Sequence, residues 1–275
     1  MRPSIRMPAV AGQFYEGDRE GLVQQIERCY LHPLGPGDLP RVNNLREGKI
    51  GGLVVPHAGY MYSGPVAAHA YRALAADGLP EAYVIIGPNH TGFGPGVATL
   101  GMDFDTPLGV AKLDRKLYEA VTAMGVPDDL SAHRYEHSVE VQLPFLLHLG
   151  DVKFLPIVMM SQDYRTAREL GAILRKAIGD RDVVVIASTD FSHYVPKEVA
   201  YKADALAIDY ILSLDPRGLF DLIRRTGLSM CGYGPVMAML ETVMGSEAHL
   251  LKYATSGDVA PMYEVVGYAA IEVDR

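Results

Sequence analysis

The sequence predicts an α/β fold, a single domain of residues 1–275 in which a largely parallel or mixed central sheet is flanked by helices. Continuous apolar runs such as "LVV", "YVII" and "VVVIA" are typical of strands buried on both faces of a sheet. Segments with helical apolar spacing alternate with these runs, which favours parallel strands joined by helices. Hydrophobic residues make up 49% of the chain and no break in composition divides it, so we expect one large core.

In the first half of the chain, turn and cap residues separate the predicted elements. Asp18 is a favourable N-cap for a helix that runs to about Tyr30. Pro65 suits the first turn of the next helix and Gly78 its end. The predicted strands of this half are 50–56, 82–88 and a shorter one at 108–114, and the predicted helices are 18–30, 64–78 and 114–124.

The second half continues the alternation. The segment "VEVQLPFLLHLG" has helical spacing, and its Pro144 either kinks the helix or lies in its first turn. The remaining predicted strands are 152–159, 182–188, 248–256 and 263–273, and the remaining predicted helices are 164–179, 197–213, 216–226 and 234–244.

Charge and composition exclude several classes of function. The net charge of −8 follows from 25 basic and 33 acidic residues, so we expect neither nucleic acid nor an anionic membrane surface as a partner. The N-terminal segment lacks the apolar core of a signal peptide, and no window resembles a membrane span. Two cysteines are too few for a disulfide framework. We therefore expect a cytoplasmic protein.

Polar side chains follow three of the predicted buried strands. His57 follows "LVVP", His90 follows "VIIGPN", and Asp190 and His193 follow "VVVIAST". Ligands of open α/β sheets bind outside the carboxyl ends of the strands. If these strands are parallel neighbours, the four side chains converge at one edge of the sheet. A single loop histidine is more often an ordinary surface residue, but three such histidines together favour a site.

Cys231 in "SMCGYGPV" precedes a predicted helix, whose N-terminus favours the thiolate form. Imidazoles combined with a thiolate suit Fe²⁺, copper or Zn²⁺ better than Mg²⁺ or Ca²⁺. The alternative is that Cys231 is a small buried hydrophobe. Cys29 lies on the apolar face of its helix, and we expect it to pack in the core.

The segment "HRYEHSVE" holds His133, Glu136 and His137. The two histidines have the i, i+4 spacing of a helical metal site, but Arg134 breaks the H-E-x-x-H pattern of zinc proteases. Helix capping, hydrogen bonds to metal ligands, and a substrate-facing acid at Glu136 remain open roles. The sequence contains no dinucleotide-binding G-x-G-x-x-G after a strand, no P-loop and no G-x-S-x-G elbow.

Six motifs in order resemble the Memo family: "AGQFYEGD", "PHAGYMYSG", "GPNHTG", "EHSVEVQLPFL", "STDFSHY" and "CGYGP". The resemblance runs from about Ala11 to Val273. It implies a fold similar to the class III extradiol dioxygenases, which are non-haem iron enzymes.

The resemblance also implies roles for individual residues. His57 and His90 would be the imidazole ligands of a metal, and Cys231 would stand where the dioxygenases have a carboxylate. His193 would match their acid/base histidine, with Asp190 beside it, and Glu136 completes our set of candidate catalytic residues. The resemblance implies iron as the first expected metal. Copper or zinc are the alternatives, because a thiolate in place of a carboxylate favours softer ions.

The family also suggests partners. The pocket would hold a small-molecule or peptide ligand, and prokaryotic members resemble a set encoded beside a radical-SAM protein. The sequence does not determine the oligomeric state or the substrate.

Three hypotheses about function follow. The first is a redox metalloenzyme of the dioxygenase type, with His193 moving protons. The second is a module on the same scaffold that binds a peptide or small molecule without turnover. The third is a zinc-dependent hydrolase with Glu136 or Asp190 as its base.

Overall fold

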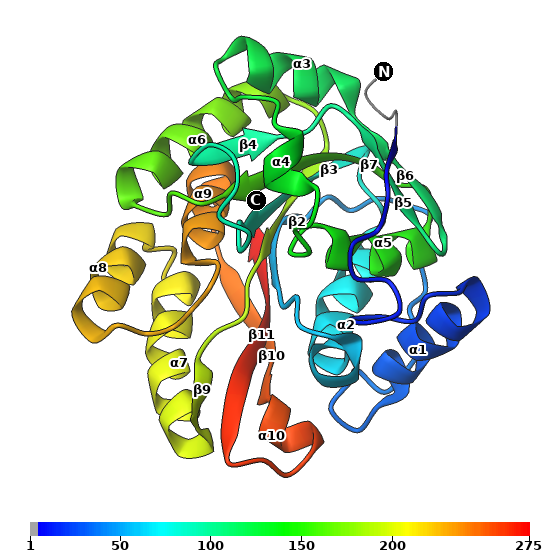
Figure 1. Cartoon of the computed structure of the whole chain (residues 1–275), viewed down its shortest axis with the longest axis vertical. Coiled ribbons are helices and arrows are strands. Elements are labelled where there is room, and N and C mark those ends of the chain that lie inside the picture. The colour runs from blue at the N-terminus through cyan, green and yellow to red at the C-terminus, as the bar shows by residue number, and fades with distance from the viewer. Residues whose placement is uncertain (1–4) are drawn as a thin grey trace.

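A mixed sheet runs through the protein and helices cover both of its faces (Figure 1). The structure is a computed structural model that describes residues 5–275, so the first four residues of the predicted domain lie outside the described part. The main strands are β2 (Ile50–Val55), β3 (Ala82–Pro88), β6 (Gly109–Leu113), β7 (Lys153–Met159), β8 (Val183–Ser188), β10 (Ala248–Thr255) and β11 (Glu264–Asp274). Short strands are β1 (Ile5–Arg6), β4 (Val97–Thr99), β5 (Asp103–Thr106) and β9 (His193–Pro196).

The central strands of the sheet are parallel, and the strands toward its β10 edge are antiparallel. The order of the strands is β1-β5-β6-β7-β3-β8-β2-β11-β10, with β4 paired to β7 and β9 to β11. Strands β6, β7, β3, β8 and β2 run parallel. Strand β11 is antiparallel to β2, and the edge strand β10 is antiparallel to β11. The predicted mixed α/β sheet is thereby confirmed.

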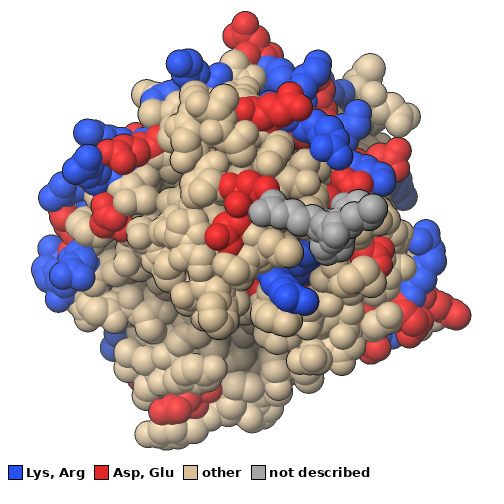
Figure 2. All heavy atoms as spheres, turned by 45° about the horizontal axis from the view of Figure 1, so that its top comes forward, with Lys and Arg blue, Asp and Glu red and all other residues tan. Residues whose placement is uncertain are grey.

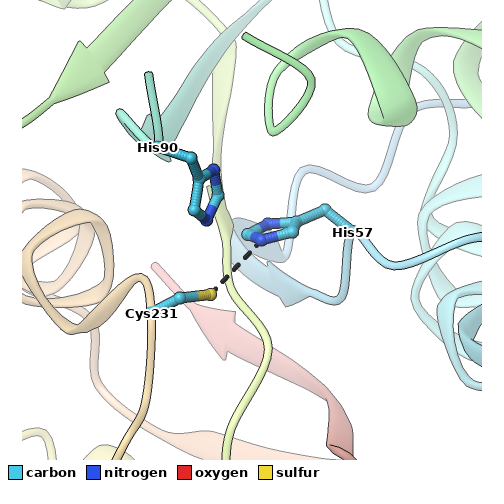
Figure 3. Close-up of side chains that lie close together, drawn as sticks. All are labelled: His57, His90 and Cys231. Carbon is cyan, nitrogen blue, oxygen red and sulfur yellow. Dashed lines mark hydrogen bonds between the residues drawn. The ribbon is translucent and has the colours of Figure 1, made fainter. Parts of the chain in front are cut away.

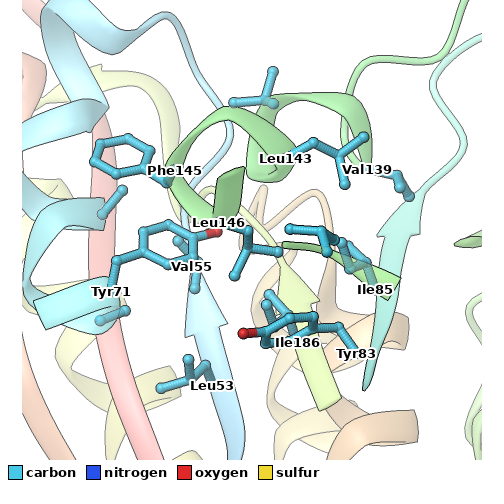
Figure 4. Close-up of a cluster of buried hydrophobic side chains, with 14 of the residues drawn as sticks. Leu53, Val55, Tyr71, Tyr83, Ile85, Val139, Leu143, Phe145, Leu146 and Ile186 are labelled. Carbon is cyan, nitrogen blue, oxygen red and sulfur yellow. The ribbon is translucent and has the colours of Figure 1, made fainter. Parts of the chain in front are cut away.

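Two apolar cores lie on opposite faces of the sheet because side chains alternate along each central strand. In β2, Leu53 and Val55 belong to one core and Val54 to the other. The first core lies under α1 (Arg19–Leu31), α2 (Tyr60–Asp77) and α5 (Leu143–Leu149). In Figure 4, Tyr71 and Phe145 face Val55 across this core, and their rings stack at 4.9 Å.

The second core lies under the helices of the other face. The helix α9 (Tyr233–Val243) packs on β8 and β3, and α6 (Tyr164–Ile178) packs on α9. The helices α3 (Arg115–Ala123), α7 (Lys197–Leu212) and α8 (Pro216–Thr226) complete this layer. Shorter elements are α4 (Leu130–His133), the 3-10 helix η1 (Glu140–Gln142) and α10 (Ser256–Val259), which joins β10 to β11.

The structure changes one predicted helix boundary and decides between the two roles left open for Pro144. Helix α2 begins at Tyr60 rather than at residue 64, so Pro65 lies inside the helix. The extra turn is anchored by the Tyr60 N–H, which donates to the Phe14 carbonyl (2.7 Å) from a distant segment. Pro144 lies in the first turn of α5, where a missing N–H costs no hydrogen bond.

Charged side chains of both signs are interspersed over the surface. On the face in Figure 2, Lys and Arg lie next to Asp and Glu around much of the outline, and a broad uncharged area occupies much of the middle. None of the helices in residues 5–275 combines the length and apolar content needed to cross a lipid bilayer.

Candidate metal centre

Three central strands deliver polar residues to one edge of the sheet. Strands β2, β3 and β8 are parallel, with β8 between the other two. His57, His90 and Asp190 each lie two residues beyond the end of their strand. The sheet therefore brings these residues together, as the sequence predicted from neighbouring parallel strands.

Cys231 reaches the same edge from the segment before α9. Its N–H donates to the Asp190 carbonyl (3.2 Å), and the next N–H, of Gly232, donates to the Thr189 hydroxyl (2.9 Å). A Cβ at Gly232 would lie 2.4 Å from the Ser188 carbonyl oxygen, so only glycine allows this approach to the end of β8.

His57, His90 and Cys231 point toward a common space (Figure 3). One ligand atom from each lies within 4.8 Å of the others, and Cys231 Sγ is 3.3 Å from His57 Nε2. Two such atoms that share a zinc-like ion are roughly 3.5 Å apart, from bonds of about 2.1 and 2.3 Å. The three residues thus have the spacing and the donor chemistry of a metal site.

The hydrogen bonds of His57 fix which of its nitrogens faces this space. Gln142 donates to the Ser188 hydroxyl (2.8 Å), which donates its own proton to the Ser138 carbonyl (2.6 Å). The remaining neighbour of this hydroxyl is His57 Nδ1 at 2.8 Å, so Nδ1 carries the proton. Burial and then the nearby His137, His90 and His193 lower the pKa of His57. The ring is neutral and presents the lone pair of Nε2.

Glu136 holds His90 in the same way. Its carboxylate accepts from the His90 backbone N–H (2.5 Å) and ring Nδ1 (2.9 Å), and from the N–H groups of His137 (2.9 Å) and Ser138 (2.8 Å). Burial raises the pKa of Glu136, but the hydrogen bond and charge of His90 lead the effects that outweigh it and lower the pKa to about 2. An ionised carboxylate only accepts, so Nδ1 of His90 donates and its Nε2 is left for a ligand.

His137 lies beside the two histidine ligands. Its ring stacks on His90 at 4.6 Å and meets His57 edge-on at 5.4 Å. Its ring centroid also lies 4.8 Å from that of Phe14. Burial lowers the pKa of His137 to about 4, so the ring is neutral near pH 7. His133 is separate: it ends α4 and its ring Nε2 contacts the Ala98 carbonyl (3.2 Å), so the two histidines do not form one helical site.

Asp190 and His193 complete the set of predicted residues at this edge. Asp190 accepts from the His57 N–H (2.9 Å), and its other oxygen is 4.0 Å from His57 Nε2. Burial raises the pKa of Asp190 to about 6 despite the hydrogen bond from the His57 N–H. His193 is half-buried, and its Nδ1 lies 2.7 and 2.8 Å from the carbonyls of Phe191 and Ser229. A carbonyl only accepts, so Nδ1 is protonated.

The expectation that a helix N-terminus would favour the Cys231 thiolate is wrong for the protein without metal. Burial, followed by the charge of Asp190, raises the pKa of the thiol. The Asp190 N–H, 3.2 Å from Sγ, opposes this shift but does not reverse it. A metal would have to displace the thiol proton in order to bind. Cys29 is buried in the core, as expected.

The sequence reasoning missed the residues that support the ligands. These are Ser188, which binds His57, and Gln142, which binds Ser188. The available signals were a serine that ends an otherwise apolar strand, and a glutamine within an apolar helical segment. Both are buried, at 0% and 1% exposure, where an unpaired polar group would be costly.

The fold and the site define an α/β protein with a candidate two-histidine, one-cysteine metal centre at the carboxyl edge of its parallel strands. The Memo-like protein family matches residues 6–272, and the chain belongs to that family. A MEMO1 family protein of Methanopyrus kandleri is 52% identical over 98% of this chain and 99% of the relative. A second, of Methanothermobacter thermautotrophicus, is 47% identical over 96% and 99%.

Among solved structures, an uncharacterized protein of Escherichia coli K12 has a similar fold. Its TM-score is 0.54 at 16% sequence identity, with 82% of this chain and 100% of that chain covered. At this identity the likeness concerns the fold alone. Similarity to extradiol dioxygenases stays a prediction from the sequence.

Proposed function

We propose that this protein binds a redox-active metal ion, iron in the first place and copper in the second, and uses it as an oxidoreductase on a small-molecule substrate. The ligands are Nε2 of His57, Nε2 of His90 and Sγ of Cys231. The observation that carries the proposal is the pair of hydrogen bonds that protonate Nδ1 of both histidines and leave both Nε2 atoms for the metal.

The donor set fits such an ion. Two neutral imidazoles and one thiolate suit iron, copper and zinc, whereas magnesium and calcium prefer oxygen ligands. Three protein ligands leave coordination positions open, as catalytic metal sites require. When bound, an iron or copper ion would supply one-electron chemistry and activate the substrate.

The chain's own residues would handle protons. Asp190 places one carboxylate oxygen 4.0 Å from His57 Nε2, beside the proposed metal, and burial raises its pKa in the metal-free chain, so this carboxyl is placed to act as a general acid or base. His193 holds its Nδ1 proton on two carbonyls, which leaves Nε2 as the ring atom that can accept a proton. Glu136 is engaged by four N–H donors of the described residues, so it is better suited to position His90 than to act as an acid.

The first test is the metal content of protein purified without oxygen, measured by elemental analysis. We expect about one iron or copper per chain in the wild type, and loss of metal in His57→Ala, His90→Ala and Cys231→Ala. Cys29→Ala is the matched control, since it removes the core thiol and should keep the metal per folded chain. Wild-type protein that binds no metal on titration would refute the proposal.

The second test separates the three classes of function. A redox enzyme consumes O₂ in the presence of a reductant or substrate, and Asp190→Asn slows this without removing the metal. Metal binding without O₂ consumption or product would favour a binding module. Hydrolysis that depends on Zn²⁺ and is insensitive to O₂ would favour a hydrolase.

A further inference from the structure

A surface pocket is lined by residues of the two chain segments that carry His90 and Glu136. Its volume is about 410 Å³, and its lining residues are Phe93, Leu130, Ser131, Arg134 and Tyr135. Phe93 is three residues after His90, and Tyr135 immediately precedes Glu136. The two segments that line the pocket therefore also hold His90 and the carboxylate bound to it.

The walls of the pocket are held in place by local contacts. The Asn89 side chain donates to the Phe93 carbonyl (2.8 Å), which fixes the loop after β3. At Gly94 the backbone has a φ of +85°, and a Cβ there would lie 2.7 Å from the Ala132 side chain. This loop thus packs tightly against α4, whose first turn is capped by Asp129. The pocket is a preformed feature of the fold.

The lining combines exposed apolar surface with a positive charge. Phe93 is 59% exposed and Tyr135 63% exposed, so both rings offer apolar surface to a ligand. The Arg134 guanidinium lies 5.5 Å from the Tyr135 ring. It makes no ion pair with any residue of the described part of the chain. An arginine held over a ring remains free to bind a carboxylate or phosphate in the plane of its N–H groups.

We propose that the pocket of Phe93, Leu130, Ser131, Arg134 and Tyr135 binds an organic anion, in which a ring-sized apolar body packs on the aromatic walls and a carboxylate or phosphate pairs with Arg134. The anion is the substrate, or part of the substrate, of the metal centre whose His90 and Glu136 lie on the same two segments. This second statement rests on the proposed function, whereas binding of the anion does not require a metal.

Charge complementarity distinguishes this ligand from other occupants. A neutral apolar molecule would leave the guanidinium without a partner, and a cation would be repelled by it. The pocket volume is near the lower end of the range for small-molecule sites, which fits one ring and its substituents rather than a folded partner.

Binding can be measured on metal-free protein with fluorinated probes followed by ¹⁹F NMR. The probes are 4-fluorophenylacetate, 4-fluorophenyl phosphate and the neutral 4-fluorobenzyl alcohol. We expect the better of the two anions to bind about tenfold more tightly than the alcohol, as one charge-assisted hydrogen-bonded pair provides. The relative affinities of the carboxylate and the phosphate identify the anionic group. Equal affinity of all three probes would overturn the proposal.

Variants assign the binding to this pocket. Arg134→Gln should weaken the anion about tenfold and leave the alcohol unchanged, while Arg134→Lys should restore part of the loss. Phe93→Ala should weaken both kinds of probe. Arg168→Gln is the matched control, because Arg168 is exposed and outside the pocket. If Arg134→Gln changes the anion no more than Arg168→Gln does, the pocket is not the binding site.

The link to the metal centre needs a separate readout. In protein loaded with Co²⁺, the anionic probe should shift the visible absorption bands, and Arg134→Gln should abolish the shift at the same probe concentration. Unshifted bands at saturating probe would refute the role of the anion as substrate. Cys231→Ala should still bind the anion like wild type, so loss of the metal and loss of the pocket are distinguishable outcomes.

Discussion

The substitution Glu136→Gln tests how the second histidine ligand is held. The Glu136 carboxylate accepts four N–H groups, three on one oxygen and one on the other. A glutamine offers one oxygen and one NH₂ group. In either orientation the NH₂ group faces at least one N–H donor, so at least one buried donor loses its acceptor.

The magnitude follows from these contacts. A buried donor left unpaired costs about 1–3 kcal/mol of stability. Loss of the carboxylate behind a metal-bound histidine weakens metal affinity by about 10–100-fold, because the ring is no longer held with its Nε2 toward the site. We expect both effects in Glu136→Gln, with the fold retained.

The assay is a competitive titration of Fe²⁺ or Co²⁺ against a chelator without oxygen, together with chemical denaturation of the metal-free protein. Glu169→Gln is the control, because Glu169 is an exposed acid whose partner is Arg165 on the surface of α6. An unchanged metal affinity in Glu136→Gln, with the expected loss of stability, would show that Glu136 has a purely structural role and would refute the reasoning.

Three further predictions concern the site and its support. Ser188→Ala removes the acceptor of His57 Nδ1–H and should weaken metal binding by about 10-fold in the same titration, whereas an unchanged affinity would contradict the assigned tautomer. Glu140→Gln leaves the buried Arg6 without its charge partner and should destabilise the protein by about 3–5 kcal/mol in denaturant; a loss below about 1 kcal/mol would show that the pair contributes little. Burial lowers the pKa of His133 to about 4 in the folded protein. Between pH 6.5 and 4 the unfolded chain therefore binds a proton on His133 that the folded chain does not. The free energy of unfolding should fall by about 3 kcal/mol as the pH drops through this window. Denaturation of wild type and His133→Gln across these pH values measures this, and equal slopes would refute it.

Much of the fold could be predicted because periodicity and end signals agreed. The strand of residues 182–188 and the helix of residues 216–226 match β8 and α8 to within a residue. The strand is a continuous buried apolar run, and the helix starts at Pro216 and is followed by Gly227, so local signals mark both elements clearly. The short strands β1, β4, β5 and β9 were missed. Each has two to four residues and is held by pairing with a distant strand, which no local pattern records.

The convergence of the site was predictable for a related reason. Parallel strands end at the same edge, so His57, His90 and Asp190 follow from the positions of three strand ends. The protonation state of the Cys231 thiol was not predictable from the sequence. Its pKa depends on how completely other segments bury the thiol, and that burial outweighs the local effect of the helix N-terminus.

The sequence by itself determined the α/β class, the order of the main elements and the residue types that meet at the carboxyl edge, because these depend on local periodicity and on chain direction. Only the tertiary structure decided which nitrogen of each histidine faces the metal space. That choice depends on Ser188 and Glu136, which lie 131 and 46 residues away in the chain from the rings they bind. A tautomer is selected by a hydrogen bond across space, and the sequence does not record which groups will be neighbours.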